Sequence, residues 1–234
     1  MCEKNNEELF SKVNKLILNN RFIEAKNILL SVNEDDILDS EKFVYYNFCF
    51  NVFIKTANVY HEHSFLEAIN FGKKAILNTE NLDRKSILSG NIAIYLMQMR
   101  KNQLAKDYVE SCLDYAKTDN LKCFAFKIQG KLMMNEGLYA EALNCLTKAA
   151  YYAEKLNEEC MQFHITLDIA SVFERMKKYN LAYIEADRAE GYSKSLKDLN
   201  LFYRVTIFKA KLLYKLGRDT EVRRIVDNVP DLVD

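Results

Sequence analysis

The sequence predicts an all-α protein in which about six helical hairpins stack into a right-handed solenoid. A small residue recurs about every 40 residues along the 234-residue chain, and repetition at this length is typical of solenoids. A second small position lies twelve residues before the first, so the two helices of each hairpin can pack closely there. The anchor residues are Ala25, Ala68, Ala105, Ala142, Ala182 and, in the sixth unit, Val222. The upstream small residues are Thr56, Ala93, Gly130, Ala170 and Ala210.

Each unit is expected to hold a first and a second helix, and polar joints separate the units. The first helices are expected near 5–18, 41–61, 86–99, 121–135, 159–176 and 199–215, and the second near 21–32, 64–78, 102–117, 138–155, 179–194 and 219–228. Asp39 or Ser40, Asp83 and Asp119 are the expected N-caps, because their side chains can accept free amide protons. The units lie near 3–36, 41–80, 84–118, 121–156, 159–195 and 199–230. They are expected to form a single domain over residues 1–234, since each repeat contacts its neighbours.

These residues resemble the tetratricopeptide repeat (TPR), a helix-turn-helix unit with small residues where its two helices touch. The best copy runs from Gly130 to Leu143 and closes on Lys148-Ala149. The resemblance extends over nearly the whole chain, from about Glu3 to Val229. The chain departs from the standard pattern in lacking Trp and in carrying Asn102 and Asp219 where an aromatic residue is expected. Its period also exceeds the ~34 residues of the standard repeat, which implies longer helices or joints.

Composition fits a helical protein of the cytoplasm. One Pro and six Gly are few, as helices require. No run of ~18 apolar residues is present, so we expect no membrane span, and the polar start from Met1 to Glu8 is unlike a signal peptide. The 33 basic and 33 acidic residues balance, so we expect no nucleic-acid partner. The six cysteines are scattered without a CxxC pair, and we interpret them as reduced structural thiols.

The segment 41–61 stands out because it is apolar around nearly its whole circumference. The run from Phe43 to Ile54 contains six aromatic residues, and a helix that is apolar on every side should be covered on every side. Two interpretations follow. The helix is either a well-buried core element or an interface for a partner or for a second copy of the chain, in which Tyr46 and Phe50 would take part.

The sequence does not predict an enzyme. There is no Gly-rich phosphate loop, and His61 and His63 are two residues apart, which is not the spacing of a helical metal pair. Cys160 and His164 lie one helical turn apart, but no third group is identified to orient them as a nucleophile and base. We therefore expect no catalytic residues, no metal site and no cofactor.

The TPR resemblance implies a concave groove lined by the first helix of each unit. The lining positions precede the anchor by about 18, 15, 14, 11 and 8 residues. The principal groove residues expected on this basis are Phe50, Phe53, Tyr60, Asn91, Ile94, Phe124, Lys127, Lys131, Arg204 and Lys211, accompanied by Met97, Met134, His164, Asp168 and Glu174. The groove should thus change from apolar near the N-terminus to charged and mainly basic near the C-terminus, where it would favour an acidic segment of a ligand.

The leading functional hypothesis is a non-enzymatic adaptor or inhibitor that binds a protein or short peptide. The long units also resemble the cytoplasmic peptide-pheromone receptors of Gram-positive bacteria and their phages, the Rap, PlcR and arbitrium-receptor group. That resemblance implies a peptide-sensing regulator in which groove asparagines hold the peptide backbone, with Asn91 as the matching residue. Those receptors carry an N-terminal effector region, whereas repeats are expected here from about residue 5. A third hypothesis is an assembly scaffold that forms homo-oligomers through the apolar helix.

Overall fold

The computed structural model describes residues 6–57 and 62–227, apart from the side chains of residues 62, 63 and 226. In these ranges the chain forms twelve α-helices, a short 3-10 helix at Glu34–Asp36, and no strand. The first helices of the hairpins are α1 (Glu7–Leu18), α3 (Lys42–Thr56), α5 (Leu82–Gln98), α7 (Asp119–Asn135), α9 (Glu159–Arg175) and α11 (Leu199–Lys215). The second helices are α2 (Phe22–Leu30), α4 (Glu62–Leu77), α6 (Asn102–Tyr115), α8 (Tyr139–Lys155), α10 (Tyr179–Leu196) and α12 (Asp219–Asp227).

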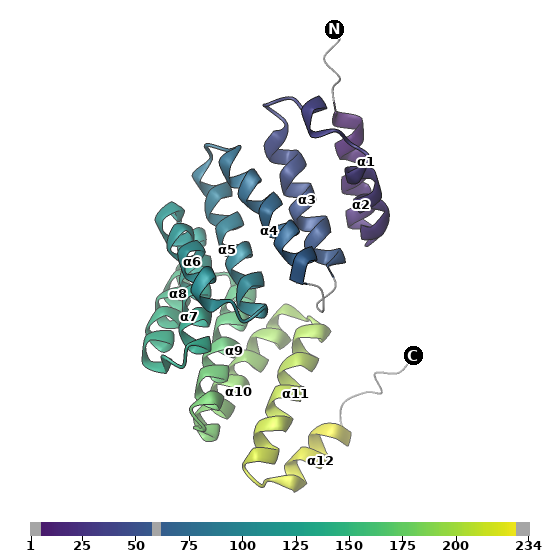
Figure 1. Cartoon of the computed structure of the whole chain (residues 1–234). Helices are drawn as coiled ribbons and strands as arrows, with labels where there is room; N and C mark the ends of the chain where they lie inside the picture. Colours follow the sequence, from purple (N-terminus) through teal and green to yellow (C-terminus); the bar gives the residue numbers. More distant parts are fainter. Residues whose placement is uncertain (1–5, 58–61, 228–234) are drawn as a thin grey trace.

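The hairpins stack in chain order along a curved array, with the first and last hairpins at opposite ends (Figure 1). Each first helix packs on the second helix of its own unit, and neighbouring units are joined through further helix contacts. α5 also contacts α7, and α7 contacts α9, so successive first helices lie side by side. The prediction of an all-α solenoid of six hairpins is confirmed.

One backbone geometry ends the first helix in five of the six units. The second residue after the helix adopts a left-handed conformation at Asn20, Arg100, Gly137, Lys177 and Gly217. The next residue then donates its N–H back to the preceding turn, as in the 2.9 Å bond from Leu138 N to Met133 O. This closure satisfies carbonyl groups that the helix leaves free. Because the turn recurs at the same repeat position, the register of the predicted units is correct.

The small residues mark the closest helix contacts, as the sequence predicts. The five anchor alanines are fully buried. A methyl group added at Gly130 would lie 2.7 Å from Leu146 Cγ and 3.3 Å from Ala142 O, so only hydrogen fits where α7 meets α8. The expected contact between Gly130 and Ala142 is therefore confirmed.

The predicted N-caps are wrong. The caps of α5 and α7 lie one or two residues before the predicted ones. The side chain of Asn81 accepts from Arg84 N at 3.0 Å, and that of Thr118 accepts from Leu121 N at 3.4 Å. Asp83 and Asp119 instead lie within the first turns of α5 and α7, where a negative charge also favours the helix dipole. α3 begins after Glu41, which makes no side-chain cap, so neither Asp39 nor Ser40 caps it.

The apolar helix α3 is a core element, which corrects two predictions. Tyr46, Phe50 and Phe53 are only 7%, 1% and 2% exposed, so they neither line an open groove nor form an accessible interface. The reason is that α3 is covered from several sides: the Phe53 ring centroid lies 4.8 Å from that of Phe71 in α4, and Lys26 of α2 lies 4.4 Å from the Phe53 centroid. Phe50 packs against α5 through an edge contact with Tyr95. Tyr60, also predicted for the groove, falls outside the described residues.

Four of the cysteines are buried free thiols, namely Cys49, Cys112, Cys123 and Cys145. Burial raises the pKa of Cys49 to about 12 and that of Cys112 to about 11, so both remain protonated near neutral pH. They act as small apolar residues, in agreement with the sequence interpretation. Within the described ranges, no helix has both the length and the apolar character that crossing a membrane requires.

Candidate functional site

A hollow of about 330 Å³ lies across three successive first helices, α5, α7 and α9. Apolar and polar side chains both line it, and most of them come from the C-terminal parts of α5 and α7. The lining residues are Ile94, Met97, Gln98, Lys131, Met134, Asn135 and Asp168. The hollow therefore lies on the groove side that the repeat register predicts, in the middle of the array.

Asp168 is the central polar group of this hollow. It is only 8% exposed, and its Oδ1 atom lies 3.2 Å from Lys131 Nζ across the α7–α9 contact. Its other oxygen, Oδ2, is buried and has no hydrogen-bond partner in the described part of the chain. A buried carboxylate oxygen without a partner loses its hydration at a cost of about 1–3 kcal/mol. Asp168 thus carries one paired oxygen and one buried oxygen without a partner among the described residues.

Two further ionisable groups extend the cluster by one helical turn. Lys127 lies four residues before Lys131 on α7, and His164 lies four residues before Asp168 on α9, so each pair shares a helix face. Lys127 is partly buried and forms no ion pair with any described residue. The charges of Lys127 and Lys131 act on both Asp168 and His164, and those of Arg204 and Asp198 also act on His164.

Burial is the largest cause of the pKa shifts in this cluster, and neighbouring charges modify it. Burial lowers the pKa of Lys127, and the nearby Asp168 only partly opposes that effect. Burial, together with Lys127, Arg204 and Lys131, lowers the pKa of His164 to about 4, so this imidazole is neutral at pH 7. Burial raises the pKa of Asp168, while Lys131 and Lys127 hold it down. One carboxylate therefore faces two lysines.

The C-terminal part of the groove is less basic than the sequence predicts. Lys211 Nζ lies 2.8 Å from Glu174 Oε1, and Lys215 Nζ lies 2.9 Å from the same oxygen. Burial of Glu174 favours its neutral form, but the two lysine hydrogen bonds outweigh this and lower its pKa. Lys211 is thus paired with a residue of the preceding unit, which offsets part of the positive charge of this region. Arg204 is exposed.

The structure brings together some of the predicted groove residues and separates others. Ile94 and Lys131 line the hollow, with Met97, Met134 and Asp168. Asn91, Phe124 and Lys127 are partly buried elsewhere on the same first helices.

Gln98 and Asn135 were missed by the sequence analysis. They are the last residues of α5 and α7 and follow the predicted lining positions Met97 and Met134 by one residue. Their polar character so close to the helix end was the available signal.

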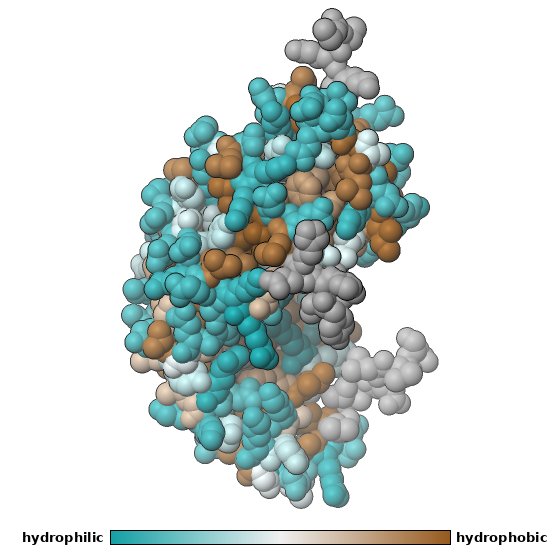
Figure 2. All heavy atoms as spheres, in the orientation of Figure 1, coloured by the Kyte–Doolittle hydropathy of each residue, from teal (hydrophilic) through white to brown (hydrophobic). Residues whose placement is uncertain are grey.

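On the face drawn in Figure 2, hydrophobic side chains lie mainly over the N-terminal hairpins, with smaller patches further along the array. Among the described residues, no group of three or more His, Cys, Asp or Glu side chains is placed to hold a metal ion.

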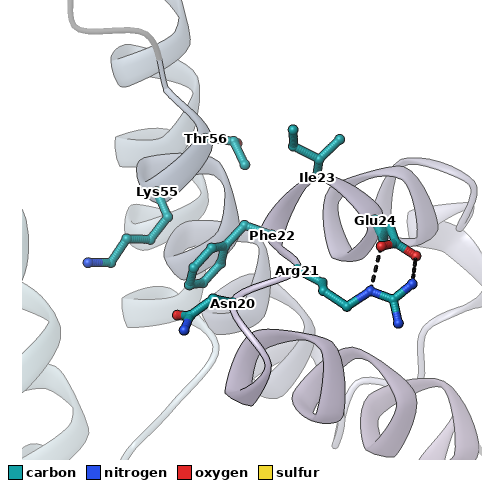
Figure 3. A pocket seen from close by; sticks show the side chains of 7 residues that line it. All are labelled: Asn20, Arg21, Phe22, Ile23, Glu24, Lys55 and Thr56. Carbon is teal, nitrogen blue, oxygen red and sulfur yellow. Dashed lines mark hydrogen bonds and ion pairs between the residues drawn. The ribbon is translucent and has the colours of Figure 1, made fainter. Parts of the chain in front are cut away.

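A second hollow, of about 530 Å³, lies where the turn between α1 and α2 meets the end of α3 (Figure 3). It is lined by Asn20, Arg21, Phe22, Ile23, Glu24, Lys55 and Thr56. The Arg21 guanidinium donates to both oxygens of Glu24, each at 2.5 Å, so these two charges satisfy one another. With its main charges paired internally, this hollow is a weaker candidate than the one around Asp168.

No protein-family model matches the sequence, and no curated protein matches it either. Solved structures do match the fold. A Rap protein complexed with competence and sporulation factor superposes with a TM-score of 0.74 at 14% identity, covering 96% of this chain and 65% of that one. Aspartyl phosphate phosphatase F from Bacillus subtilis gives 0.69 at 16% identity, covering 96% and 63%. YrrB, described as a TPR protein with an unusual peptide-binding site, gives 0.52 at 17%, covering 87% and 92%.

These similarities define the class of the protein as a TPR-like α-solenoid. Identities of 14% to 17% establish a shared fold and nothing finer. The chain spans less than two thirds of the length of the first Rap protein and of phosphatase F. The predicted resemblance to TPR arrays and to the Rap-type solenoid is confirmed at the level of fold.

Proposed function

We propose that this chain is a non-enzymatic binding protein that holds a peptide, or an extended segment of a protein, in the groove formed by its first helices. The observation that carries the proposal is the hollow around Asp168. It combines the apolar side chains of Ile94, Met97 and Met134 with the polar side chains of Gln98, Lys131 and Asn135. Such a mixture of apolar surface and a few polar groups is typical of ligand-binding sites.

The structural neighbours support a peptide as the ligand class. One neighbour is a Rap protein complexed with competence and sporulation factor, and another, YrrB, is described as having a peptide-binding site. The hollow of about 330 Å³ is large enough for one or two side chains, with the remainder of a peptide extending along the first helices.

A peptide-sensing regulator of the Rap type is the second candidate function. It is favoured by the superposition over 96% of this chain with the Rap protein. In that case the cytoplasm would be the site of action. The two candidates share the same groove and differ in whether peptide binding changes the interaction with a second protein. Self-association through Tyr46 and Phe50 is not proposed, because both side chains are buried within the chain.

Selection from a random peptide library tests the proposed function. Peptides that bind the wild-type protein should be lost with Ile94→Trp, since a larger side chain at this position fills the hollow without changing any charge. Leu104→Trp is the matched control, because Leu104 is exposed on the second helix α6. Peptides that bind the Ile94 variant as well as the wild type would place the ligand outside the groove. The absence of any bound peptide would contradict the proposal.

A further inference from the structure

The two ends of the array differ in the side chains that they present where a neighbouring unit would pack. Inside the array, Phe124 and Ile128 of α7 lie against Gly90 of α5, and a methyl group added at Gly90 would come within 2.7 Å of Ile128. At the repeat positions of Phe124 and Ile128, α1 carries Glu7 and Ser11, and both are exposed. The N-terminal end therefore has the polar outer face that a terminal repeat needs for solubility.

The opposite end of the array keeps apolar side chains where the next unit would pack. Ile207 of α11 is 61% exposed, whereas Leu167, at the same repeat position in α9, is 5% exposed and belongs to the core that α9 shares with α10 and α11. Tyr214 is 72% exposed, whereas Met97, at its repeat position in α5, is 7% exposed. The described part of the chain thus leaves uncovered the face of α11 on which a further first helix would pack (Figure 1).

The spacing of this face fits a helix as its partner. Tyr203, Ile207, Ala210 and Tyr214 follow one another at steps of four, three and four residues, so they form one stripe along α11. Steps of this kind form the seam between two packed helices. Tyr203 and Ala210 are half-buried, and Ile207 and Tyr214 are the exposed members of the stripe. A helix with apolar residues at matching intervals would bury both of these side chains.

The charge of the last hairpin indicates the chemistry of that helix. From the start of α11 to the end of α12, the chain carries seven basic and three acidic residues. Three of the lysines, Lys209, Lys211 and Lys215, pair with carboxylates of α9 and α10. Arg204 and Arg223 are exposed, and neither lies within ion-pair distance of a carboxylate in the described ranges. The hairpin therefore attracts a partner of negative charge.

Pairing between copies of this chain does not meet these requirements. Two α11 faces brought together would place Arg204 of each copy near the basic hairpin of the other, and like charges that face one another oppose association. Stacking the C-terminal end of one copy on the N-terminal end of another would lay Ile207 and Tyr214 on the polar face of α1 that carries Glu7 and Ser11. Both arguments favour a different protein as the partner.

We propose that the exposed face of α11 docks an acidic amphipathic helix of another protein, whose apolar stripe covers Ile207 and Tyr214 and whose carboxylates lie near Arg204. Arg204 is suited to this contact because it lies three residues before Ile207, at the edge of the same stripe. This surface is distinct from the hollow between α5, α7 and α9, so the inference does not depend on the proposed function.

Two libraries of amphipathic helices of about 21 residues, or six turns, test the inference. Both libraries randomise the apolar stripe among Leu, Ile, Val, Met and Phe. The polar positions are Glu and Gln in one library and Lys and Gln in the other. Wild-type protein should retain at least about tenfold more of the Glu library, because its charge is complementary to that of the last hairpin.

Variants of the protein locate the docking surface. Ile207→Ser should weaken binding of the selected helices by about tenfold, because burying an isoleucine side chain contributes strongly to binding, and Tyr214→Ser should act in the same direction. Ile184→Ser is the matched control, because Ile184 lies on the second helix α10 and is 60% exposed, almost as much as Ile207. Ile94→Trp, which fills the hollow, should also leave binding of the helices unchanged. Circular dichroism verifies that each variant is folded.

Several results would overturn the inference. Equal recovery from the two libraries, or no recovery from either, would refute an acidic helix as the partner. Selected helices that bind Ile207→Ser as tightly as the wild type would place their site elsewhere on the protein. A dimer in light scattering that Ile207→Ser dissociates would identify a second copy of the chain as the occupant. None of these outcomes bears on the proposed function, whose peptides are tested through the Ile94→Trp variant.

Discussion

Lys209 and Lys127 are two lysines withdrawn from solvent between neighbouring helices, and their surroundings are opposite. Lys209 is 7% exposed, lies 2.6 Å from Asp187, contacts Glu190 and lies over the Tyr183 ring. Burial alone would lower its pKa, but hydrogen bonds with Asp187 and Glu190 outweigh that effect and raise it. Lys127 has no such carboxylate, and burial lowers its pKa.

The difference separates a structural charge from a functional one. The carboxylates around Lys209 come from α10 and hold the joint between the last two units together. Lys127 instead is partly buried without an ion-pair partner among the described residues. A buried charge that is paired within the protein should stabilise the folded state relative to its own removal, whereas an unpaired one should not.

The largest expected effect tests the alignment of the repeats, which predicts that Ala142 of α8 packs directly against α7. Ala142→Arg places a long charged side chain between α7 and α8, where Gly130 and Leu146 leave no room. We expect a loss of more than about 4 kcal/mol in the free energy of unfolding, or failure to fold. The control is Ala140→Arg, two residues earlier on the exposed face of the same helix. If the two variants have equal thermal midpoints by circular dichroism, the register of this hairpin is wrong.

The next effect concerns the paired lysine. Lys209→Met should lower the free energy of unfolding by about 2 kcal/mol, because Glu190 and Asp187 lose a shared partner. The loss is limited because Glu190 keeps Lys194 at 2.8 Å and Asp187 is largely exposed. Urea titration measures it, with Lys106→Met as a control that should change the value by less than about 0.5 kcal/mol. A Lys209 variant as stable as this control would show that the ion pairs of Lys209 do not stabilise the fold.

A smaller effect is expected from replacing two glycines, one after α7 and one within α10. Gly137 follows α7 with φ +80°, so Gly137→Ala should cost about 1 kcal/mol. Gly191 lies next to Glu190 within α10, and a methyl group there meets open space. Gly191→Ala should therefore add about 0.5–1 kcal/mol by favouring the helix. Urea midpoints that shift in the same direction for both variants would show that one of these backbone assignments is incorrect.

The smallest expected effect is the pH dependence of the Lys209 cluster. Burial favours the neutral form of Glu190, but hydrogen bonds from Lys194 and Lys209 outweigh this and lower its pKa in the folded state. A lowered carboxyl pKa stabilises the fold above the unfolded value of about 4.3, and this stability is lost as the pH falls through the folded value. Wild-type protein should thus lose slightly more stability than Lys209→Met between pH 6 and pH 3. An identical loss would show that the pair is not coupled.

The fold followed from the sequence because its determinants are local and repeated. A small residue such as Ala142 is needed where the two helices of a hairpin touch, and a turn residue such as Gly137 follows five of the six first helices at the same position. Neither requirement depends on distant parts of the chain. The same regularity placed Ile94 and Lys131 correctly on the groove side.

The site was only partly predictable because its charges pair between units. Glu174 neutralises Lys211 from the preceding unit, and the pairing depends on how far each hairpin is rotated relative to the last. Phe50 and Phe53 follow the groove pattern, but α3 is covered by its neighbours, which the alignment of repeats does not show. The unsatisfied oxygen of Asp168 is likewise a property of three-dimensional packing.

The free energy of unfolding of Lys127→Met at pH 7 tests the central claim, that Lys127 serves the groove and not the fold. Removing a partly desolvated, unpaired charge should leave stability unchanged or raise it by up to about 1 kcal/mol, while the same substitution at Lys209 lowers it. The two variants are measured side by side in urea. A loss at Lys127 comparable to that at Lys209 would mean that Lys127 stabilises the fold, and would contradict the central claim.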